Sequence, residues 1–365
     1  MVLAFSIVNP LLAVALQRQG YSAGAIGVFA MLPFLSIALT LPWLPRVFAR
    51  LGVPRAYRLG LVLEMLGMAG FSLGDGYALW CACSVLSSVG AAALWNGSEA
   101  MIAFNAPPGL RGRVTGLYQS ALGAALALGP FVPGLVAALG TVVEPRVLVA
   151  AAPLLLVAAL ALVAGPALGR LAVAHTEARA YTLGDALGAR PGLAWIAFTG
   201  GVFEAGLGSI GAAHGSQLGY SVAAATSIAG ALGVGSFALQ YPAGWVADHL
   251  PMRRVFAAAG VLLVVSAAAF AASGERPALL WASAFVWGAV GGALYTLTMV
   301  QVAHEFAASS AMAGTAAMIA GYTAGGALGP VVAGLLLDGF GATGLGGGLA
   351  LLAASVLGVA GRMRG

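Results

Sequence analysis

The residue of this sequence with the clearest chemical potential is Glu204, a carboxylic acid inside a long apolar segment. It follows Gly-Gly-Val-Phe and precedes Ala-Gly, near the middle of residues 192–213. An ionisable group is costly to place within a bilayer, so such groups are functional candidates by default. We expect Glu204 to bind and release a proton or to contact a bound solute. A neutral, hydrogen-bonded packing role is the alternative.

Other polar or aromatic side chains in comparable apolar segments are candidates for lining a solute site. Trp95 and Tyr295 occupy equivalent points of an internal repeat, so they can face each other across a pseudo-twofold axis. Single aromatic residues in apolar helices serve more often in packing, which is the competing interpretation. The candidates beside Glu204 are Asn9, Trp95, Asn96, Tyr295 and Gln301, followed by Gln119 and Tyr322 in two other apolar segments.

A second chemical pattern joins a carboxylate to two arginines across a short polar turn. Asp248 precedes Arg253 and Arg254 in Gly-Trp-Val-Ala-Asp-His-Leu-Pro-Met-Arg-Arg. A carboxylate at this place can pair with the arginines or cap a neighbouring helix end. We expect the group to act as a latch that closes in one conformation and opens in another. The alternative is a solvated turn whose arginines only set membrane topology.

The corresponding stretch of the first half has the arginines but lacks the acid. It reads Pro-Arg-Val-Phe-Ala-Arg-Leu-Gly-Val-Pro-Arg, so Ala49 stands where the second half has Asp248. A latch in the first half therefore needs an acid from elsewhere in the chain. We expect Glu99 to supply it, by pairing with Arg50 or with the arginines that follow residue 110.

Nothing in the sequence indicates a metal site or an enzyme active site. Cys81 and Cys83 are the only cysteines and point to roughly opposite faces of a helix, while the four histidines lack ligand spacing. There is no Walker-type nucleotide loop and no cluster of nucleophile and base. We therefore expect no metal, no cofactor and no enzymatic activity, and we expect an ion gradient to supply any energy.

Composition predicts that most of the chain lies in a membrane. Hydrophobic residues make up 61% of the sequence and charged residues only 7%, whereas soluble domains carry roughly 25% charged residues. The apolar runs are continuous and about 20 residues long, as spanning helices require, without the alternation of membrane β-barrels. We predict an all-α integral membrane protein. Outside these runs no basic, aromatic-interleaved segment occurs, so we expect no nucleic-acid partner.

Twelve membrane-spanning helices are predicted, in two similar halves. The motif Ala-Leu-Gly-Pro-x-Val-x-Gly-Leu occurs at residues 127–135 and again about 200 positions later, at 327–335. We expect a six-helix bundle over residues 1–165, a polar cytoplasmic linker over 166–191 and a second six-helix bundle over 192–365. The predicted spans cover residues 2–17, 23–44, 56–73, 77–104, 114–139, 147–165, 192–213, 221–247, 253–272, 278–302, 310–337 and 344–361.

The repeated motif contains one Gly-Pro pair in each half, Gly129-Pro130 and Gly329-Pro330. Proline removes a hydrogen bond from the helix backbone, and glycine lets a neighbouring helix approach closely. We therefore expect each pair to bend its helix and to pack tightly against another one.

The arginines predict how the chain is oriented. All sixteen basic residues are arginine, and with both termini in the cytoplasm thirteen of them lie inside, leaving Arg18, Arg146 and Arg276 outside. Cytoplasmic loops of membrane proteins carry such an excess of basic residues. We therefore expect a bacterial inner-membrane protein with both termini in the cytoplasm. We expect the first apolar segment to be a span of the repeat rather than a cleaved signal.

These features resemble the major facilitator superfamily: twelve spans in two parallel-related halves, a polar linker, and arginine-rich turns after spans 2 and 8. That family's Gly-x-x-x-Asp-Arg-x-Gly-Arg-Arg signature is similar to the stretch from Gly244 to Arg254 and, with Ala49 as a departure, to the stretch after Pro45. The resemblance implies a cavity lined by spans 1, 4, 7 and 10. In the family's drug–proton antiporters span 5 carries a Gly-Pro signature, but the matching pair in span 11 favours a packing role here.

The resemblance implies a monomeric secondary transporter that moves a small molecule across the membrane by alternating access, and Glu204 favours proton coupling. A uniporter and a transport-inactive sensor or scaffold of the same fold are the alternatives, and Ala49 slightly favours the scaffold. The few charges within the spans disfavour organic phosphates, which usually need arginines inside the membrane. Neutral or amphipathic solutes are more compatible with this sequence.

Overall fold

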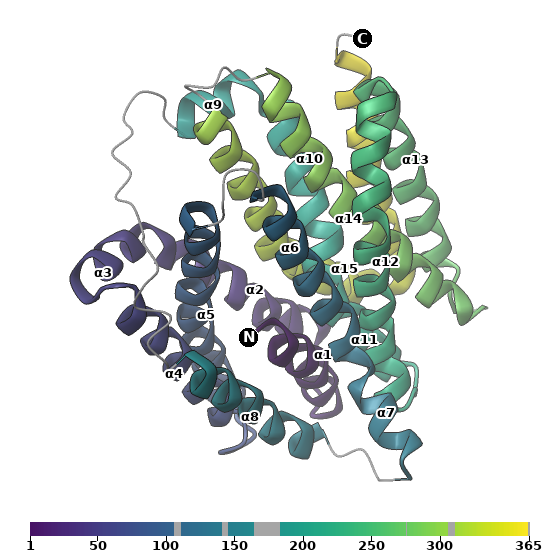
Figure 1. Ribbon diagram of the computed structural model, residues 1–365. Helices are drawn as coiled ribbons and strands as arrows, with labels where there is room; N and C mark the ends of the chain where they lie inside the picture. Colours follow the sequence, from purple (N-terminus) through teal and green to yellow (C-terminus); the bar gives the residue numbers. More distant parts are fainter. Residues whose placement is uncertain (106–110, 141–144, 164–182, 275, 306–310, 364–365) are drawn as a thin grey trace.

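The computed structural model describes residues 1–105, 111–140, 145–163, 183–274, 276–305 and 311–363, and this part of the chain is helical without strands (Figure 1). Eight of its helical segments are long and apolar enough to cross a membrane, by length and composition. The all-α membrane class agrees with the sequence. The count of twelve spans stays a prediction, because some apolar helices, such as Val2–Arg18, are shorter than this measure requires.

The first half of the chain begins with a turn that the sequence encodes directly. Gly20 adopts a positive φ of 87°, and the Ser22 hydroxyl accepts a hydrogen bond from Ala25 N at 3.2 Å, which caps the following helix. The helices of this half are α1 (Val2–Arg18), α2 (Ala23–Thr40), η1 (Leu41–Trp43), α3 (Leu44–Leu51), α4 (Val53–Gly70), α5 (Tyr77–Asn105), α6 (Arg111–Leu128), η2 (Gly129–Phe131), α7 (Val132–Ala138) and α8 (Pro145–Val163).

The second half repeats the same turn. Gly219 has a φ of 84°, and the Ser221 hydroxyl accepts from Ala224 N at 3.2 Å. The repeated Gly-Tyr-Ser thus serves one structural purpose twice, to reverse the chain and start a helix. The helices of this half are α9 (Leu183–Ala189), α10 (Pro191–Gly201), η4 (Val202–Gly206), α11 (Leu207–Gln217), α12 (Val222–His249), α13 (Met252–Ala271), α14 (Ala278–Glu305) and α15 (Ala311–Arg362).

Three interruptions differ from the continuous or separate spans expected from the sequence. Residues 192–213 do not form one regular helix, because the π-helical turn η4 joins α10 to α11. In the first half, Gly129-Pro130 lies in the 3-10 turn η2, which divides α6 from α7. Pro330, by contrast, lies inside α15, whose backbone bends at Gly341 (φ 65°, ψ −163°) between the last two expected spans. Glycine permits that conformation because it has no side chain to clash.

The two halves lie side by side and meet through three sets of helices. In Figure 1, α3, α4, α5 and α8 lie on one side, and α10, α13, α14 and α15 lie on the other. Between the sides, α2 packs on α15, α6 and α7 pack on α12, and α1 packs on α11. The backbones touch, since a Cβ on Gly27 would lie 2.2 Å from the Pro330 carbonyl oxygen and one on Gly334 would lie 2.1 Å from that of Ala23.

These contacts lie toward the end of the molecule that carries the Gly20 and Gly219 turns, here called the Gly20 end. Aromatic pairs close each turn there in both halves. Tyr21 stacks on Tyr77 with ring centroids 5.1 Å apart, and Tyr220 packs on Trp281 at 5.5 Å. The repeat therefore preserves the packing of its turns as well as their backbone.

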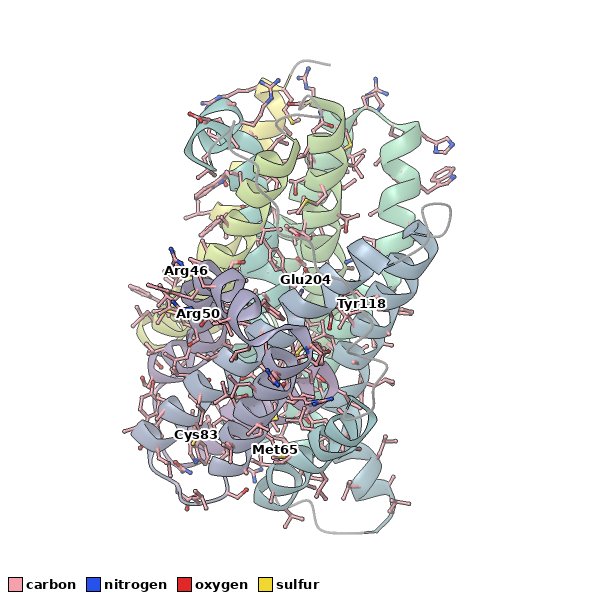
Figure 2. The ribbon with its side chains drawn as sticks, turned by 60° about the vertical axis from the view of Figure 1, so that its left-hand side comes forward. Arg46, Arg50, Met65, Cys83, Tyr118 and Glu204 are labelled. Atoms are coloured by element: carbon pink, nitrogen blue, oxygen red, sulfur yellow. The ribbon has the colours of Figure 1, made fainter. Side chains whose placement is uncertain are left out.

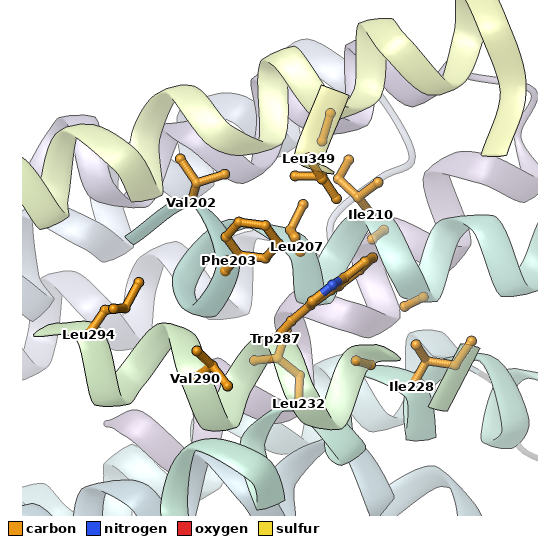
Figure 3. Packing of buried hydrophobic residues seen from close by; sticks show 14 of the residues in the cluster. Val202, Phe203, Leu207, Ile210, Ile228, Leu232, Trp287, Val290, Leu294 and Leu349 are labelled. Carbon is orange, nitrogen blue, oxygen red and sulfur yellow. The ribbon is translucent and has the colours of Figure 1, made fainter. Parts of the chain in front are cut away.

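The core of the second half surrounds η4 (Figure 3). Phe203 of η4 and Trp287 of α14 are buried with ring centroids 6.1 Å apart, and Trp287 also packs on Phe270 of α13 at 4.9 Å. Figure 3 shows Val290 and Leu294 continuing this apolar contact along α14. The π-helical turn is therefore enclosed by closely packed apolar side chains.

Gly288 of α14 provides a test of how closely these helices pack. A Cβ at this position would lie 1.8 Å from the Leu232 carbonyl oxygen of α12. We expect Gly288→Ala to lower the free energy of unfolding by about 3 kcal/mol, because the helices must move apart. The measurement is the melting temperature of the purified protein in detergent.

Gly347 of α15 is the matched control, since a Cβ there would meet nothing within 4 Å. Gly347→Ala should leave the melting temperature unchanged or raise it slightly, because alanine favours helix more than glycine does. If Gly288→Ala and the unsubstituted protein melted at the same temperature, α12 and α14 would pack less closely than the structure shows.

Candidate functional site

The π-helical turn η4 sets the position of Glu204. A π turn makes i→i+5 hydrogen bonds, and such turns inside α-helices are frequent at functional sites. Here close packing against α15 holds the turn: a Cβ on Gly201 would lie 2.0 Å from the Tyr322 carbonyl oxygen, and one on Gly206 would lie 2.6 Å from Pro330 Cδ. The backbone of Glu204 is therefore fixed between neighbouring helices.

The carboxylate of Glu204 is held from α12 and from α15. The Ser236 hydroxyl donates a hydrogen bond to Oε1, and the Tyr322 hydroxyl donates one to Oε2 at 2.8 Å. A Cβ on Gly292 of α14 would lie 2.6 Å from Oε1, so the glycine leaves the space that the carboxylate occupies. A hydrogen bond to an ionised group contributes about 2 kcal/mol. Three helices thus keep the carboxylate in one place.

Further polar and aromatic groups adjoin this carboxylate. Gln240 lies one turn after Ser236 on α12, and its Oε1 accepts a hydrogen bond from the Thr296 hydroxyl at 2.5 Å. Gln240 Nε2 also lies near Gly292, 2.9 Å from where a Cβ would stand. The Tyr295 ring packs on that of Tyr322 with centroids 4.6 Å apart. We call this group the Glu204 cluster: Glu204, Ser236, Gln240, Tyr295, Thr296 and Tyr322.

The Glu204 cluster combines groups that can recognise a proton or a small organic solute. The carboxylate accepts hydrogen bonds or a proton, the Gln240 amide donates and accepts, and the tyrosine rings offer apolar faces. The two hydrogen bonds to Glu204 are partly buried among apolar helices, so they are stronger than they would be in water, whereas the Gln240–Thr296 bond is exposed. Within the cluster, hydrogen bonds join Ser236 and Tyr322 to Glu204, and Thr296 to Gln240.

Of the residues proposed from the sequence as cavity lining, the structure brings Tyr295 and Tyr322 into the Glu204 cluster. Asn9 lies in the first half, beside a cavity of about 20 Å³ that Ser84, Ser87 and Ser88 also line. That volume holds roughly one water molecule. Trp95 is 40% exposed on α5. The side chains of Asn96 and Gln119 lie outside the described residues.

Gln301 belongs to a different group of polar side chains, at the end of α14. Its Nε2 donates to the carboxylate of Glu305, which forms an ion pair with Arg190 at the start of α10. This pair ties the two helix ends within the second half. Gln301 therefore contacts this ion pair, and its place in the cavity stays a prediction.

Comparison with known proteins decides the family. Residues 1–203 and 193–363 each match the family model described as Major Facilitator Superfamily. This chain belongs to the major facilitator superfamily. Membership makes it a multi-pass membrane transporter and not an enzyme, as the sequence predicts.

Two relatives illustrate how far the sequence similarity extends. An uncharacterized MFS-type transporter, YcaD of Escherichia coli O9:H4 (strain HS), is 26% identical over 350 residues, which cover 93% of this chain and 86% of the relative. A chloramphenicol resistance protein of Streptomyces lividans is 41% identical over 101 residues. That match covers only 28% of this chain and a quarter (25%) of the relative's length.

Solved structures of three transport proteins share the fold. The nucleoside transporter NupG, solved as a point mutant, has a TM-score of 0.72 at 14% identity and covers 98% of this chain and 96% of its own. A D-xylose-proton symporter has a TM-score of 0.71 at 14% identity, with coverage of 97% and 94%. A bacterial homolog of the human lysosomal transporter Spinster, inward-facing and unoccupied, has a TM-score of 0.68 at 15% identity, with coverage of 98% and 92%.

The structure describes the arginine side chains of the superfamily's loop signature but not the acidic ones. Arg253 and Arg254 are exposed at the start of α13, and Arg50 is exposed near the end of α3. Figure 2 shows Arg50 and Arg46 at the edge of the molecule and Glu204 in its interior. The side chains of Asp248 and Glu99, the proposed acidic partners, lie outside the described residues. Both latches therefore remain predictions.

Three members of the Glu204 cluster were not proposed from the sequence: Ser236, Gln240 and Thr296. A signal was present, because Ser236 and Gln240 are four residues apart and so lie on one face of a helix. That spacing identifies a polar face within an apolar span. It does not say which helix the face meets, and the contact with Glu204 followed only from the packing of α12 against η4.

Glu64 is a second buried carboxyl group in this superfamily member, and it lies apart from the Glu204 cluster. It is 1% exposed on α4 of the first half. Neither of its carboxyl oxygens has a hydrogen-bond partner in the described part of the structure. Gly90 of α5 packs directly on its backbone, since a Cβ there would lie 2.6 Å from Glu64 N.

Proposed function

We propose that this protein is a secondary active transporter that moves a small solute across the bacterial inner membrane by alternating access, with proton coupling through Glu204. It acts as a monomer of twelve spans, with bundles at residues 1–165 and 192–365 joined by the linker 166–191. Both termini lie in the cytoplasm, so the Gly20 end faces outward. Asp248 with Arg253 and Arg254, and Glu99 with Arg50, are the proposed latches at the opposite end.

The observation that carries the proposal is the Glu204 carboxylate, placed mid-span with hydroxyl donors on both oxygens. Its donors belong to α12 and α15. These are the helices of the second half that pack on α6 and α7 and on α2 of the first half. Any change in the charge of Glu204 therefore acts on the helices that join the halves.

A proton can be coupled to motion by this arrangement. When Glu204 is ionised, it accepts from both Ser236 and Tyr322 and draws α12 and α15 toward η4. When it is protonated, one oxygen donates to the hydroxyl that faces it, and both hydrogen bonds lose the strength that the negative charge gave them. Protonation therefore favours a different relative position of α12 and α15, and with it a different arrangement of the halves.

The chemistry of the Glu204 cluster favours a neutral or amphipathic solute. The cluster offers one carboxylate, an amide, hydroxyl groups and two tyrosine rings, and it contains no arginine. Organic phosphates are disfavoured, because they require fixed positive charge within the membrane. The solved neighbours named for nucleosides and for D-xylose are consistent with this class of solute.

The proposal is tested by measuring proton movement in proteoliposomes. Thermal-shift screening of the purified protein against a broad solute library identifies a ligand, and that ligand is then added outside vesicles that contain a pH-sensitive dye. We expect the ligand to drive proton movement across the membrane together with its own uptake. Uptake without proton movement would identify a uniporter.

The alternative is a sensor or scaffold that retains the fold without transport, and Ala49 is the observation that favours it. In that case a ligand from the screen binds the protein but neither crosses the vesicle membrane nor moves protons. The same experiment therefore separates all three functions.

A further inference from the structure

A carboxylate of the second half caps the first turn of a helix of the first half. Asp338 Oδ1 accepts a hydrogen bond from Ala23 N at 2.7 Å, and Oδ2 accepts one from Gly24 N at 2.6 Å. The Ser22 hydroxyl accepts from Ala25 N, the next donor of α2. The first N–H groups of a helix have no partner within it, and negative charge near them is stabilising. Asp338 thus completes the cap of α2 from another part of the chain.

This contact sits where the two halves touch most closely. A Cβ on Gly24 would lie 3.0 Å from Asp338 Oδ2 and 3.0 Å from Leu335 Cδ2, and Gly334 packs on the carbonyl of Ala23. The glycines bring the helices near enough for the carboxylate to reach two backbone donors. The cap and the close packing therefore form and break together when the halves separate at the Gly20 end.

The corresponding place in the repeat has no such contact. The position 200 residues before Asp338 is Ala138, the last residue of α7, and α7 packs on α12 as α15 packs on α2. At the start of α12 the Ser221 hydroxyl caps Ala224 N, while Val222 and Ala223 have no side-chain acceptor in the described part of the structure. A cap needed only for helix stability would be expected in both halves. Because the carboxylate cap is present on α2 and, among the described residues, not on α12, it indicates a role in holding the two halves together.

We infer that Asp338 is a clasp that holds the Gly20 end of the transporter closed in this conformation. This inference rests on the proposed alternating access. When the Gly20 end opens, both hydrogen bonds of Asp338 are lost at once, so the clasp favours the closed state and slows the opening step. Asp338 acts through α2 and does not touch the solute, so it is a positioning residue.

The test measures the distance between the halves at the Gly20 end. Cys81 and Cys83 are replaced by alanine, and spin labels are attached at Leu73→Cys and Leu218→Cys, positions 82% and 45% exposed in the two halves. Distances are recorded for the purified protein in lipid nanodiscs without solute. We expect Asp338→Asn to add a longer distance and to raise the ratio of open to closed molecules roughly tenfold, because an amide can accept only one of the two bonds.

Two further variants separate the clasp from a general loss of stability. Ala23→Pro removes one donor of the clasp at the first position of α2, where proline suits the helix, and it should shift the distances in the same direction. The double variant should add little to either single change, because both remove the same interaction. Asp338→Glu keeps a carboxylate and should partly restore the closed distance. Ser22→Ala removes a cap of α2 that comes from the first half itself, so it controls for the stability of the helix end and should leave the distances unchanged.

The clasp is overturned if folded Asp338→Asn keeps the distances of the unsubstituted protein, or if it only lowers the melting temperature. It is also overturned if Ser22→Ala opens the halves equally, or if Asp338→Asn and Ala23→Pro shift the distances additively. Should Asp338→Asn fail to fold, Ala23→Pro and Asp338→Glu decide the question by the same criterion. These distances require neither solute nor transport, so loss of the proposed function alone leaves this outcome unaffected.

Discussion

Glu204→Gln is expected to abolish the pH dependence of transport and to reduce active accumulation of the solute at least about tenfold, because glutamine cannot bind a proton and loses a charge-assisted hydrogen bond. The side chain keeps its size, so the space beside Gly292 stays filled. Exchange of solute across the membrane without a gradient should persist. The measurement is solute uptake by proteoliposomes over a range of pH, with and without an imposed proton gradient.

Glu64→Gln is the matched control, because it makes the same change at a buried carboxyl group of the other half. We expect it to leave the pH profile of transport in place. Tyr322→Phe, which removes one donor to the Glu204 carboxylate, should shift that profile without flattening it. A normal pH profile for Glu204→Gln, or an equal loss for Glu64→Gln, would remove Glu204 from the coupling role.

Gly27→Val is expected to stop transport by keeping the Gly20 end from closing. The first carbon of the new side chain would lie 2.2 Å from the Pro330 carbonyl oxygen and 2.9 Å from Val331 Cα, both on the backbone of α15. Backbone atoms cannot rotate away, so α2 and α15 must separate. We expect uptake by proteoliposomes to fall at least about tenfold while the protein still elutes as a single folded species.

Gly134→Val controls for the effect of valine in a helix toward the Gly20 end. A Cβ at Gly134 of α7 would meet nothing within 4 Å, so this variant should transport normally. Normal uptake by Gly27→Val would mean that closure at the Gly20 end is unnecessary for transport. Aggregation of Gly27→Val would instead assign the contact to folding, which size-exclusion chromatography reports.

Many helices were predictable because residue types at the turns decide where each helix begins. The Gly-Tyr-Ser turns show this best, since glycine allows the positive φ and serine caps the next helix in both halves. The bend at Gly341 falls in the gap expected between the last two spans. The π-helical turn at Glu204 was not predicted, because an apolar, glycine-rich segment fits regular helix equally well until α15 packs against it.

Some residues of the site were also predictable from the sequence, and others were not. Glu204 and Tyr295 were identified from the cost of placing polar groups in apolar segments and from the repeat. The sequence did not predict that Gln301, six residues beyond Tyr295, bonds Glu305 of the Arg190–Glu305 ion pair, because Arg190 lies on another helix. Asp338 was not proposed at all, since its partners are backbone N–H groups, which leave no trace in residue type.

The sequence by itself determined that the chain lies in a membrane, where most helices begin and end, and that its two halves are similar. These properties depend on hydropathy, turn chemistry and spacing along one chain. Only the tertiary structure decided which polar groups meet. Glu204 joins Ser236 and Tyr322, and Asp338 joins α2, over separations of 32, 118 and more than 300 residues. Contacts at such separations depend on how closely the helix backbones approach, and glycine positions such as Gly27, Gly292 and Gly334 set that approach in three dimensions.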